Sequence, residues 1–285
     1  MKIRYKTLYF IALLAVSGLS LAQQPPMTFS TEPYKYKVLD SAYMKCTYQL
    51  TYWKDSTRKD STLNDTQTLL IGKFISKYYS QEALDWQQYI QENFKNANAV
   101  PGIKNRGVWS WEIIKNYPQE KATVTDIGSE LMGDFLYEED LPSLNWKMQE
   151  ESREILSYRC QKATVSFRGR DYIAWYAPEI PVDNGPWKFG GLPGLILKIY
   201  DTKENFIFEC IGLETLKTKE PVKFYLLDYT KLKRQGYLKM EQRFHDDLIK
   251  YNNDLGIMTI ISDPQTGKDL KLESYKLPFN PIELE

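Results

Sequence analysis

Histidine is almost absent from this sequence, since His245 is the only one among 285 residues. Ser-His-Asp and Cys-His catalytic centres need an imidazole as their base, and catalytic zinc sites usually take two or three histidine ligands. His245 lies in a predicted helix, and Asp246 and Asp247 beside it do not share its face of that helix. We therefore interpret His245 as an exposed or half-packed helix residue that is dispensable for any activity of the protein.

Phosphate-binding loops are also missing, because the sequence contains neither a GxxxxGK[ST] nor a GxGxxG segment. Gly190-Gly191 and Gly194 come closest to such a loop, but no strand leads into them and no helix follows. Net charge is missing as well, since 37 basic residues balance 37 acidic ones. The sequence thus predicts no cofactor, no metal ligands, no catalytic residue and no nucleic-acid partner.

The N-terminus has the pattern of a secretory signal peptide. Residues 1–6 are basic, the stretch that follows is apolar, and Ser20-Leu21-Ala22 offers the small side chains that a signal peptidase requires. No later segment is apolar enough over a sufficient length to span a bilayer. We expect cleavage after Ala22, a mature chain of residues 23–285 that forms one domain, and a location in the periplasm, in the cell envelope or outside the cell.

Cysteine is scarce, and all three cysteines lie in the mature chain. In an oxidising compartment one pair of Cys46, Cys160 and Cys210 could form a disulfide and leave one thiol, and the three pairings stay open. The spacings are too wide for a CxxC redox motif or a zinc knuckle. Buried, small apolar side chains are the simplest interpretation.

Alternation of apolar and polar residues predicts mostly strands. Residues 41–55 and 67–80 follow this pattern, with Gly72 as a candidate bulge in the second of them. Residues 108–148 contain four short strand-like segments with the spacing of an antiparallel meander. From Cys160 to about Leu213, four further segments alternate and are joined by short connections, so four consecutive antiparallel strands are expected there.

Two helices are expected, over residues 80–96 with Ser80 as N-cap and over residues 230–256. The predicted fold class is therefore mainly β (α+β), with a curved, half-barrel-like antiparallel sheet and about two packed helices.

Acidic residues are plentiful, so a pair of carboxylates could meet in a cleft as in glycoside hydrolases. The densest acidic cluster is Glu138 to Asp140, which we interpret as an acidic turn. Arg168 and Arg170 flank a hairpin glycine and could hold a carboxylate or phosphate through bidentate hydrogen bonds. As turn residues they would instead pair with Asp171 or Glu179.

The stretch from Gly185 to Gly194 interrupts the strands with glycines and prolines around two aromatic residues, Trp187 and Phe189. Pro193 removes a ladder N–H, and Gly194 permits a positive φ or a close backbone approach. The aromatic pair either closes one end of the core or lines the mouth of a ligand site. We expect this corner to be structural before it is functional.

The hexapeptide Gly191-Leu192-Pro193-Gly194-Leu195-Ile196 and the segment Ser157–Gly191 before it resemble the GLPGLI family of Bacteroidetes-type bacteria. The resemblance implies an exported protein without an established biochemical role, so it supplies no catalytic residues. More loosely, the strand pattern is similar to the curved sheets of periplasmic lipoprotein carriers. The candidate residues for a ligand site, a partner site or a structural corner are Arg168, Arg170, Trp175, Pro186, Trp187, Phe189, Gly190, Gly191, Leu192, Pro193 and Gly194.

These features favour a non-enzymatic binding, accessory or carrier module of the cell envelope, with an apolar or peptide ligand or an outer-membrane partner. The alternative is an envelope hydrolase with paired carboxylates. A wide apolar cavity would favour the carrier, two facing carboxylates in a cleft would favour the hydrolase, and an exposed flat aromatic patch would favour the partner.

Overall fold

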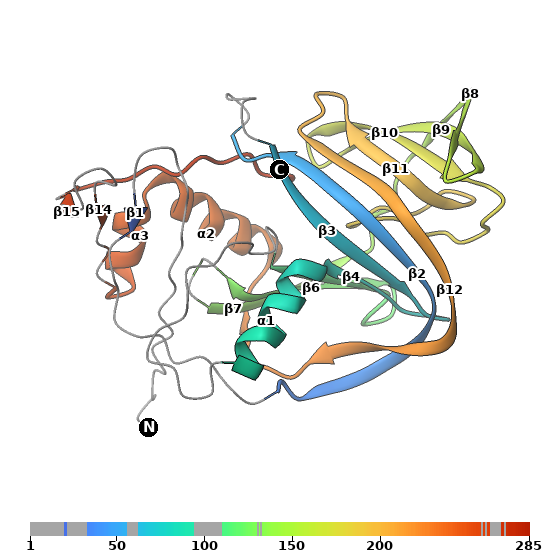
Figure 1. The fold of residues 1–285 in the computed structure, drawn as a ribbon. Coiled ribbons are helices and arrows are strands. Elements are labelled where there is room, and N and C mark those ends of the chain that lie inside the picture. The colour runs from blue at the N-terminus through green and yellow to red at the C-terminus, as the bar shows by residue number, and fades with distance from the viewer. Residues whose placement is uncertain are drawn as a thin grey trace.

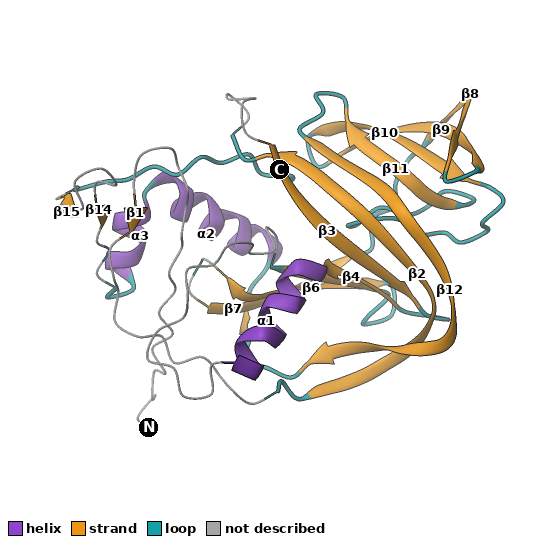
Figure 2. Ribbon diagram, in the orientation of Figure 1, coloured by secondary structure: helices purple, strands orange, loops and turns teal. Residues whose placement is uncertain are grey.

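The computed structural model describes residues 20–21, 33–55, 62–93, 110–129, 131, 133–257, 259, 261–262, 269–270 and 272–285. Apart from Ser20-Leu21, the predicted signal segment lies outside these residues. Most of the described chain forms one open sheet of twelve strands, and three helices accompany it (Figure 1; Figure 2). The predicted fold class, mainly β with a curved antiparallel sheet, is confirmed.

The sheet order is β13-β7-β6-β5-β4-β3-β2-β12-β11-β10-β9-β8. Its neighbours run antiparallel, except β13, which lies parallel to β7. The strands are β2 Tyr36–Trp53, β3 Thr62–Ile71, β4 Ser76–Ser80, β5 Trp111–Lys115, β6 Lys121–Ser129, β7 Gly133–Asp140, β8 Lys147–Ile155, β9 Tyr158–Phe167, β10 Arg170–Ala177, β11 Leu195–Asp201, β12 Phe206–Tyr225 and β13 Thr230–Lys231. Two-residue strands β1 Ser20–Leu21, β14 Ile261–Ser262 and β15 Asp269–Leu270 form a separate small sheet.

The curvature of the large sheet follows from the connection between β7 and β8. These strands lie near opposite ends of the sheet, yet only residues 141–146 join them. Seven peptide steps span at most about 25 Å, so the two ends of the sheet must approach each other. The expectation that residues 108–148 form one continuous meander is therefore right for β5, β6 and β7 and wrong for β8.

The four strands expected between Cys160 and Leu213 are confirmed as β9, β10, β11 and β12, each paired antiparallel with the next. β2 alternates as predicted, with Cys46, Tyr48 and Leu50 fully buried. It pairs with β12 along nearly the whole length of both strands, with a register shift between Thr215 and Glu220. The ribbon of these two strands is bent (Figure 1).

Residues 67–80 do not form one strand. They make the hairpin of β3 and β4, and Gly72 is part of its turn rather than a bulge, because the Gly72 N–H donates to the carbonyl oxygen of Ile75 at 2.9 Å. The Asp40 carboxylate fixes this turn by accepting from the backbone N–H groups of Phe74 and Ile75. A short turn whose N–H groups are bonded to a distant side chain leaves no simple signature in local alternation.

The first predicted helix is α1, Gln81–Asn93, and Ser80 caps it as expected, since its Oγ accepts from the Ala83 N–H at 3.0 Å. The second predicted helix is in fact two helices, α2 Arg234–Asp246 and α3 Leu248–Asp254. Asp247 adopts an extended conformation between them and caps α3 through its side chain, which accepts from the Lys250 N–H. The helix count is thus three among the described residues, not two.

α2 lies against the concave side of the sheet near β7 (Figure 2). Tyr237 of α2 anchors it, because its hydroxyl accepts from the indole N–H of Trp111 at 2.8 Å and donates to Asp126 at 2.7 Å. His245 is buried rather than exposed or half packed, and its ring stacks on Phe279 with a centroid distance of 4.0 Å. None of the helices among the described residues has the length and apolarity to cross a membrane.

Candidate functional site

The corner from Gly185 to Gly194 places its two aromatic residues in the core. Trp187 and Phe189 are both fully buried, with ring centroids 5.1 Å apart. Phe189 also packs edge-on against Tyr172 of β10 at 4.8 Å. The two aromatic residues therefore close one end of the core, and neither ring lines the mouth of a ligand site.

Gly194 is required for close backbone approach rather than for a positive φ. An ideal Cβ at this position would lie 2.3 Å from the carbonyl oxygen of Ala177 and 3.0 Å from Cα of Pro178. Gly191, by contrast, has a φ of +83°. The hexapeptide thus needs each of these two glycines for a different reason.

We expect Gly194→Ala to lower the free energy of unfolding by about 2–3 kcal/mol, because the clash is with backbone that no side-chain rotation can relieve. Gly236→Ala in α2 is the matched control, since nothing lies within 4 Å of a Cβ there. Alanine favours helices, so the control is expected to be neutral or to stabilise by up to about 1 kcal/mol. Urea unfolding of both variants measures this, and equal stabilities for them would rule out the close-approach explanation.

Lys115 of β5 holds the same corner from inside. Its buried ammonium donates to Oδ1 of Asn184 at 2.9 Å, to the carbonyl oxygen of Gly185 at 2.7 Å and to that of Phe189 at 2.6 Å. Sequence inspection missed this residue, because a lysine in a short alternating segment is usually solvated. Burial lowers the pKa of Lys115 to about 7, although Asp183 and Cys46 oppose that change.

Stability is therefore expected to rise with pH above neutrality. The folded state releases the Lys115 proton near pH 7, whereas an unfolded lysine keeps it to about 10.5. Between these values the unfolded state binds more protons, so the free energy of unfolding should increase by about 1–2 kcal/mol from pH 7.0 to 8.5. Chemical denaturation at both pH values tests this. The variant Lys115→Met should lack this increase in the free energy of unfolding. An identical pH dependence in both proteins would mean that the three acceptors keep the ammonium charged.

Arg168 lies in the turn between β9 and β10, whereas Arg170 is the first residue of β10, and the predicted partners of both are wrong. Arg168 pairs with Glu139 of β7 at 2.7 Å, and Arg170 pairs with Asp201 at 3.2 Å. Asp171 instead accepts a hydrogen bond from Ser166. Both arginines thus hold carboxylates, as their chemistry suggested, and these carboxylates belong to the chain itself.

Five charged side chains form a largely buried cluster, which we call the charge cluster: Glu139, Arg168, Lys188, Arg234 and Glu283. Lys188, between the two core aromatics of the corner, contacts Glu139 and donates to Glu283 at 2.5 Å. Arg234 at the start of α2 donates through Nε to Glu283 at 2.5 Å. Glu139 therefore lies in a strand and in this cluster, so interpreting it as part of an acidic turn was wrong.

The two glutamates of the charge cluster are the facing carboxylates that a hydrolase would require. Burial disfavours the ionised form of Glu283, but Lys188 and then Arg234 outweigh it and lower its pKa. A general acid needs the opposite shift, towards a raised pKa. The side chain of Glu283 is also only 1% exposed. Glu283 is thus suited to holding structure together and not to protonating a leaving group.

The tail, residues 275–285, is held near its end by two sets of contacts, since Glu283 belongs to the charge cluster and its neighbours bond to Arg168 and Arg170. Arg170 donates through Nε to the carbonyl oxygen of Ile282 at 3.1 Å and through Nη2 to that of Pro281 at 2.5 Å. The N–H of Leu284 in turn donates to the carbonyl oxygen of Arg168 at 2.9 Å. The turn between β9 and β10 therefore holds a peptide segment mainly through that segment's backbone.

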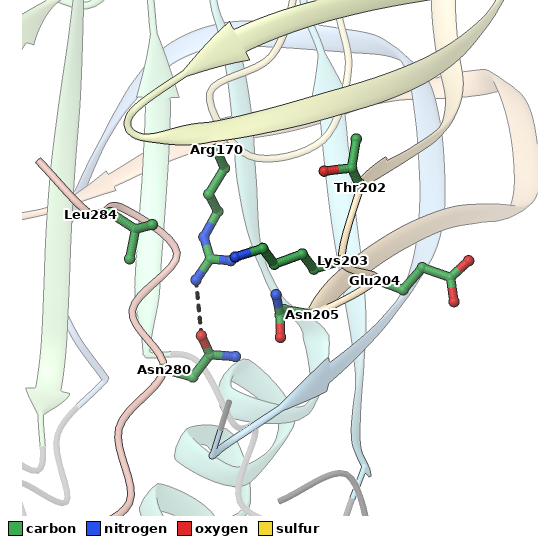
Figure 3. Close-up of a pocket in the computed structure, with 7 residues that line it drawn as sticks. All are labelled: Arg170, Thr202, Lys203, Glu204, Asn205, Asn280 and Leu284. Atoms are coloured by element: carbon green, nitrogen blue, oxygen red, sulfur yellow. Dashed lines mark hydrogen bonds between the residues drawn. The ribbon is translucent and has the colours of Figure 1, made fainter. Parts of the chain in front are cut away.

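A cleft of about 560 Å³ opens beside the tail (Figure 3). Arg170 and the turn that joins β11 to β12 form one side, and Asn280 and Leu284 of the tail form another. Figure 3 shows Arg170 reaching from its strand to Asn280, with Lys203 on the turn between β11 and β12. The lining is mostly polar and charged, so the cleft differs from the apolar cavity that a lipid carrier would need.

A second cleft, of about 520 Å³, lies between the end of β8 and the strands β11 and β12. Its charged side chains include Lys198 and Glu209, which neutralise each other at 2.8 Å.

Trp175 of β10 is buried outside both clefts, and the guanidinium of Arg153 lies 4.5 Å from its ring centroid. No group of three or more His, Cys, Asp or Glu side chains within the described ranges could bind a metal.

The three cysteines are buried and free in the structure. Burial raises the pKa of Cys160 to about 11 and that of Cys210 to about 12. The thiols are therefore protonated near neutrality and poorly reactive, as expected for small core residues.

Sequence comparison finds similarity to a family over one short stretch. Residues 167–198, from the end of β9 into β11, match a family described as a protein of unknown function (Porph_ging). This stretch contains both arginines of the turn and the whole corner, and it overlaps the segment that carries the GLPGLI resemblance. No curated sequence matches the chain.

Solved structures show only distant likeness. Two crystal forms of PNGF-II share 14% sequence identity with this chain at a TM-score of 0.46. The aligned regions cover 71% and 73% of this chain, but only 33% and 34% of the PNGF-II chains. The chain thus spans about a third of the length of these structures. An uncharacterized conserved protein from Thermus thermophilus shares 11% sequence identity with this chain at a TM-score of 0.33. The aligned region covers 67% of this chain and 90% of the Thermus chain.

Proposed function

We propose that this protein is a non-enzymatic binding module of the cell envelope that holds an extended peptide segment of a partner protein in the cleft beside its tail. One observation carries the proposal. The turn between β9 and β10 already holds the tail through backbone carbonyl and N–H groups of Pro281, Ile282 and Leu284. Backbone hydrogen bonds are how extended peptides gain affinity with little dependence on sequence.

The alternatives have less support. The facing carboxylates Glu139 and Glu283 are buried in the charge cluster and do not line the cleft, which disfavours a carboxylate hydrolase. An apolar carrier would need an open hydrophobic interior, but Trp187, Phe189 and Phe208 fill the space behind the corner. A polar cleft of this size suits a short peptide segment better than an acyl chain.

Export is part of the proposal. It rests on the predicted signal peptide with cleavage after Ala22 and on the GLPGLI resemblance of the segment around the corner. N-terminal sequencing of the protein from the envelope fraction of expressing cells should begin at Gln23. A chain that starts at Met1 and stays in the cytoplasm would contradict this part alone.

Peptide selection tests the binding function. A phage library of random twelve-residue peptides is selected on the mature chain, and the enriched peptides are measured by fluorescence polarisation. Thr202→Trp should fill the cleft and abolish binding, because Thr202 is an exposed residue of its lining. Thr218→Trp, at an exposed position on the far part of β12, should leave binding unchanged. The proposal fails if no enriched peptide is sensitive to Thr202→Trp, with both variants melting like the parent protein.

A further inference from the structure

The cleft beside the tail offers a cation that the protein does not use. Lys203 lines the cleft, is exposed, and forms no hydrogen bond or ion pair with the described residues. The other basic side chain of the cleft, Arg170, is paired with Asp201 at 3.2 Å. The Lys203 ammonium has no such partner among the described residues, so the cleft carries two basic side chains of which only one is paired.

Hydrogen-bond donors are also in excess in the lining of the cleft. A guanidinium has five N–H donors and an ammonium three. Contacts to the tail and to Asp201 use four of the donors of Arg170: one on Nε, one on Nη1 and two on Nη2. The Nδ2 of Asn205 donates to Asp201 at 2.9 Å. The lining thus keeps one donor of Arg170, one of Asn205 and all those of Lys203 for a bound group.

The carboxylate nearest in sequence does not neutralise Lys203. Glu204 lines the cleft but directs its carboxylate away from Arg170 and Lys203 in Figure 3. The Glu204 backbone lies in the left-handed region, with a φ of +55°. Its N–H donates to the carbonyl oxygen of Asp201 at 2.7 Å, and its own carbonyl accepts from the indole of Trp53 at 2.9 Å.

The turn that presents Lys203 is therefore held at both ends. Besides the indole contact, the Trp53 N–H donates to the carbonyl oxygen of Asn205 at 3.0 Å, and the Thr202 N–H donates to that of Asp171 at 2.8 Å. A cation on a fixed turn loses less entropy on binding than one on a free loop. Its position beside the tail is thus set before any ligand arrives.

We propose that the peptide segment held in this cleft is acidic, and that Lys203 binds a carboxylate side chain of it with the free Nη1–H of Arg170 as second donor. The inference rests on the proposed peptide-binding function. It follows from charge complementarity: a ligand carboxylate supplies the acceptor that Lys203 lacks among the described residues, together with one for the donor that Arg170 keeps.

The same peptide selection tests this inference separately. Among peptides whose binding depends on Thr202, Asp and Glu should be enriched. Lys203→Gln should weaken these peptides about fivefold, the size of one partly exposed ion pair. Replacing the critical Glu by Gln in the peptide should cost the same factor, and the two changes together should cost no more than either alone. Lys217→Gln, at an exposed position on β12, is the matched control and should have no effect.

The outcomes separate the two proposals. Lys203→Glu should reverse the preference, so that peptides with Lys or Arg bind better than acidic ones. If peptides sensitive to Thr202→Trp show no acidic enrichment and tolerate Lys203→Gln, the acidic specificity is wrong while peptide binding stands. If no selected peptide is sensitive to Thr202→Trp, peptide binding itself is wrong.

Discussion

Replacing Lys188 by methionine is expected to lower the free energy of unfolding by about 3–5 kcal/mol, because it leaves two buried carboxylates without their shared ammonium. Burial opposes the charge of Lys188, but Tyr137, Glu283 and Glu139 together hold its pKa above the ordinary value. Arg168 and Arg234 each contact both glutamates and remain in the variant, but they reach the Oε2 atoms, whereas Lys188 contacts Oε1 of both. Thermal and urea unfolding of the mature chain measure the loss.

An exposed ion pair provides the control for Lys188. Lys162 and Glu151 lie 2.8 Å apart on neighbouring strands, and the glutamate side chain is 63% exposed. Lys162→Met is expected to change stability by less than about 1 kcal/mol. A double-mutant cycle of Lys188→Met with Glu283→Gln should show coupling of at least about 1 kcal/mol. Additive effects, or a Lys188 variant as stable as the Lys162 variant, would show that the charge cluster does not secure the tail.

Local patterns in the sequence predicted the positions of helices and strands better than they predicted which of these elements are neighbours in space. The alternation of β2 identified its buried face correctly, and Ser80 was recognised as the cap of α1. The place of β8 could not be predicted, because it depends on the sheet ends approaching each other. The break at Asp247 was missed as well, since a capping aspartate within a helical pattern also suits a continuous exposed face.

The candidate site shows the same division. The corner with its two aromatic residues and the two arginines that flank Gly169 were singled out from the sequence alone. The partners of the arginines were sought close in sequence, whereas Glu139 and Glu283 come from a strand and a tail that are distant along the chain. Lys188 was overlooked although it lies between Trp187 and Phe189. A charged residue between two predicted core positions was the available sign of a buried ion pair.

Trp187→Ala is expected to lower the free energy of unfolding by about 3–5 kcal/mol, the range for truncating a fully buried aromatic residue. The Trp187 ring lies 5.7 Å from that of Phe167, so truncation leaves a cavity beneath the turn that carries Arg168. The indole N–H has no hydrogen-bond partner among the described residues, and the backbone has a φ of +48°. The ring therefore contributes through its volume and not through its polar atom.

Trp187→Phe separates these contributions, because it keeps most of the ring volume and removes the unpaired N–H. We expect this variant to lose less than about 1.5 kcal/mol, as for other hydrophobic exchanges that conserve shape. Both variants should bind the cleft peptides like the parent protein at temperatures where they are folded, since Trp187 does not line the cleft. An alanine variant that melts like the parent and loses peptide binding would instead make Trp187 a ligand contact, and the corner would then be a site rather than a support for the turn that grips the tail.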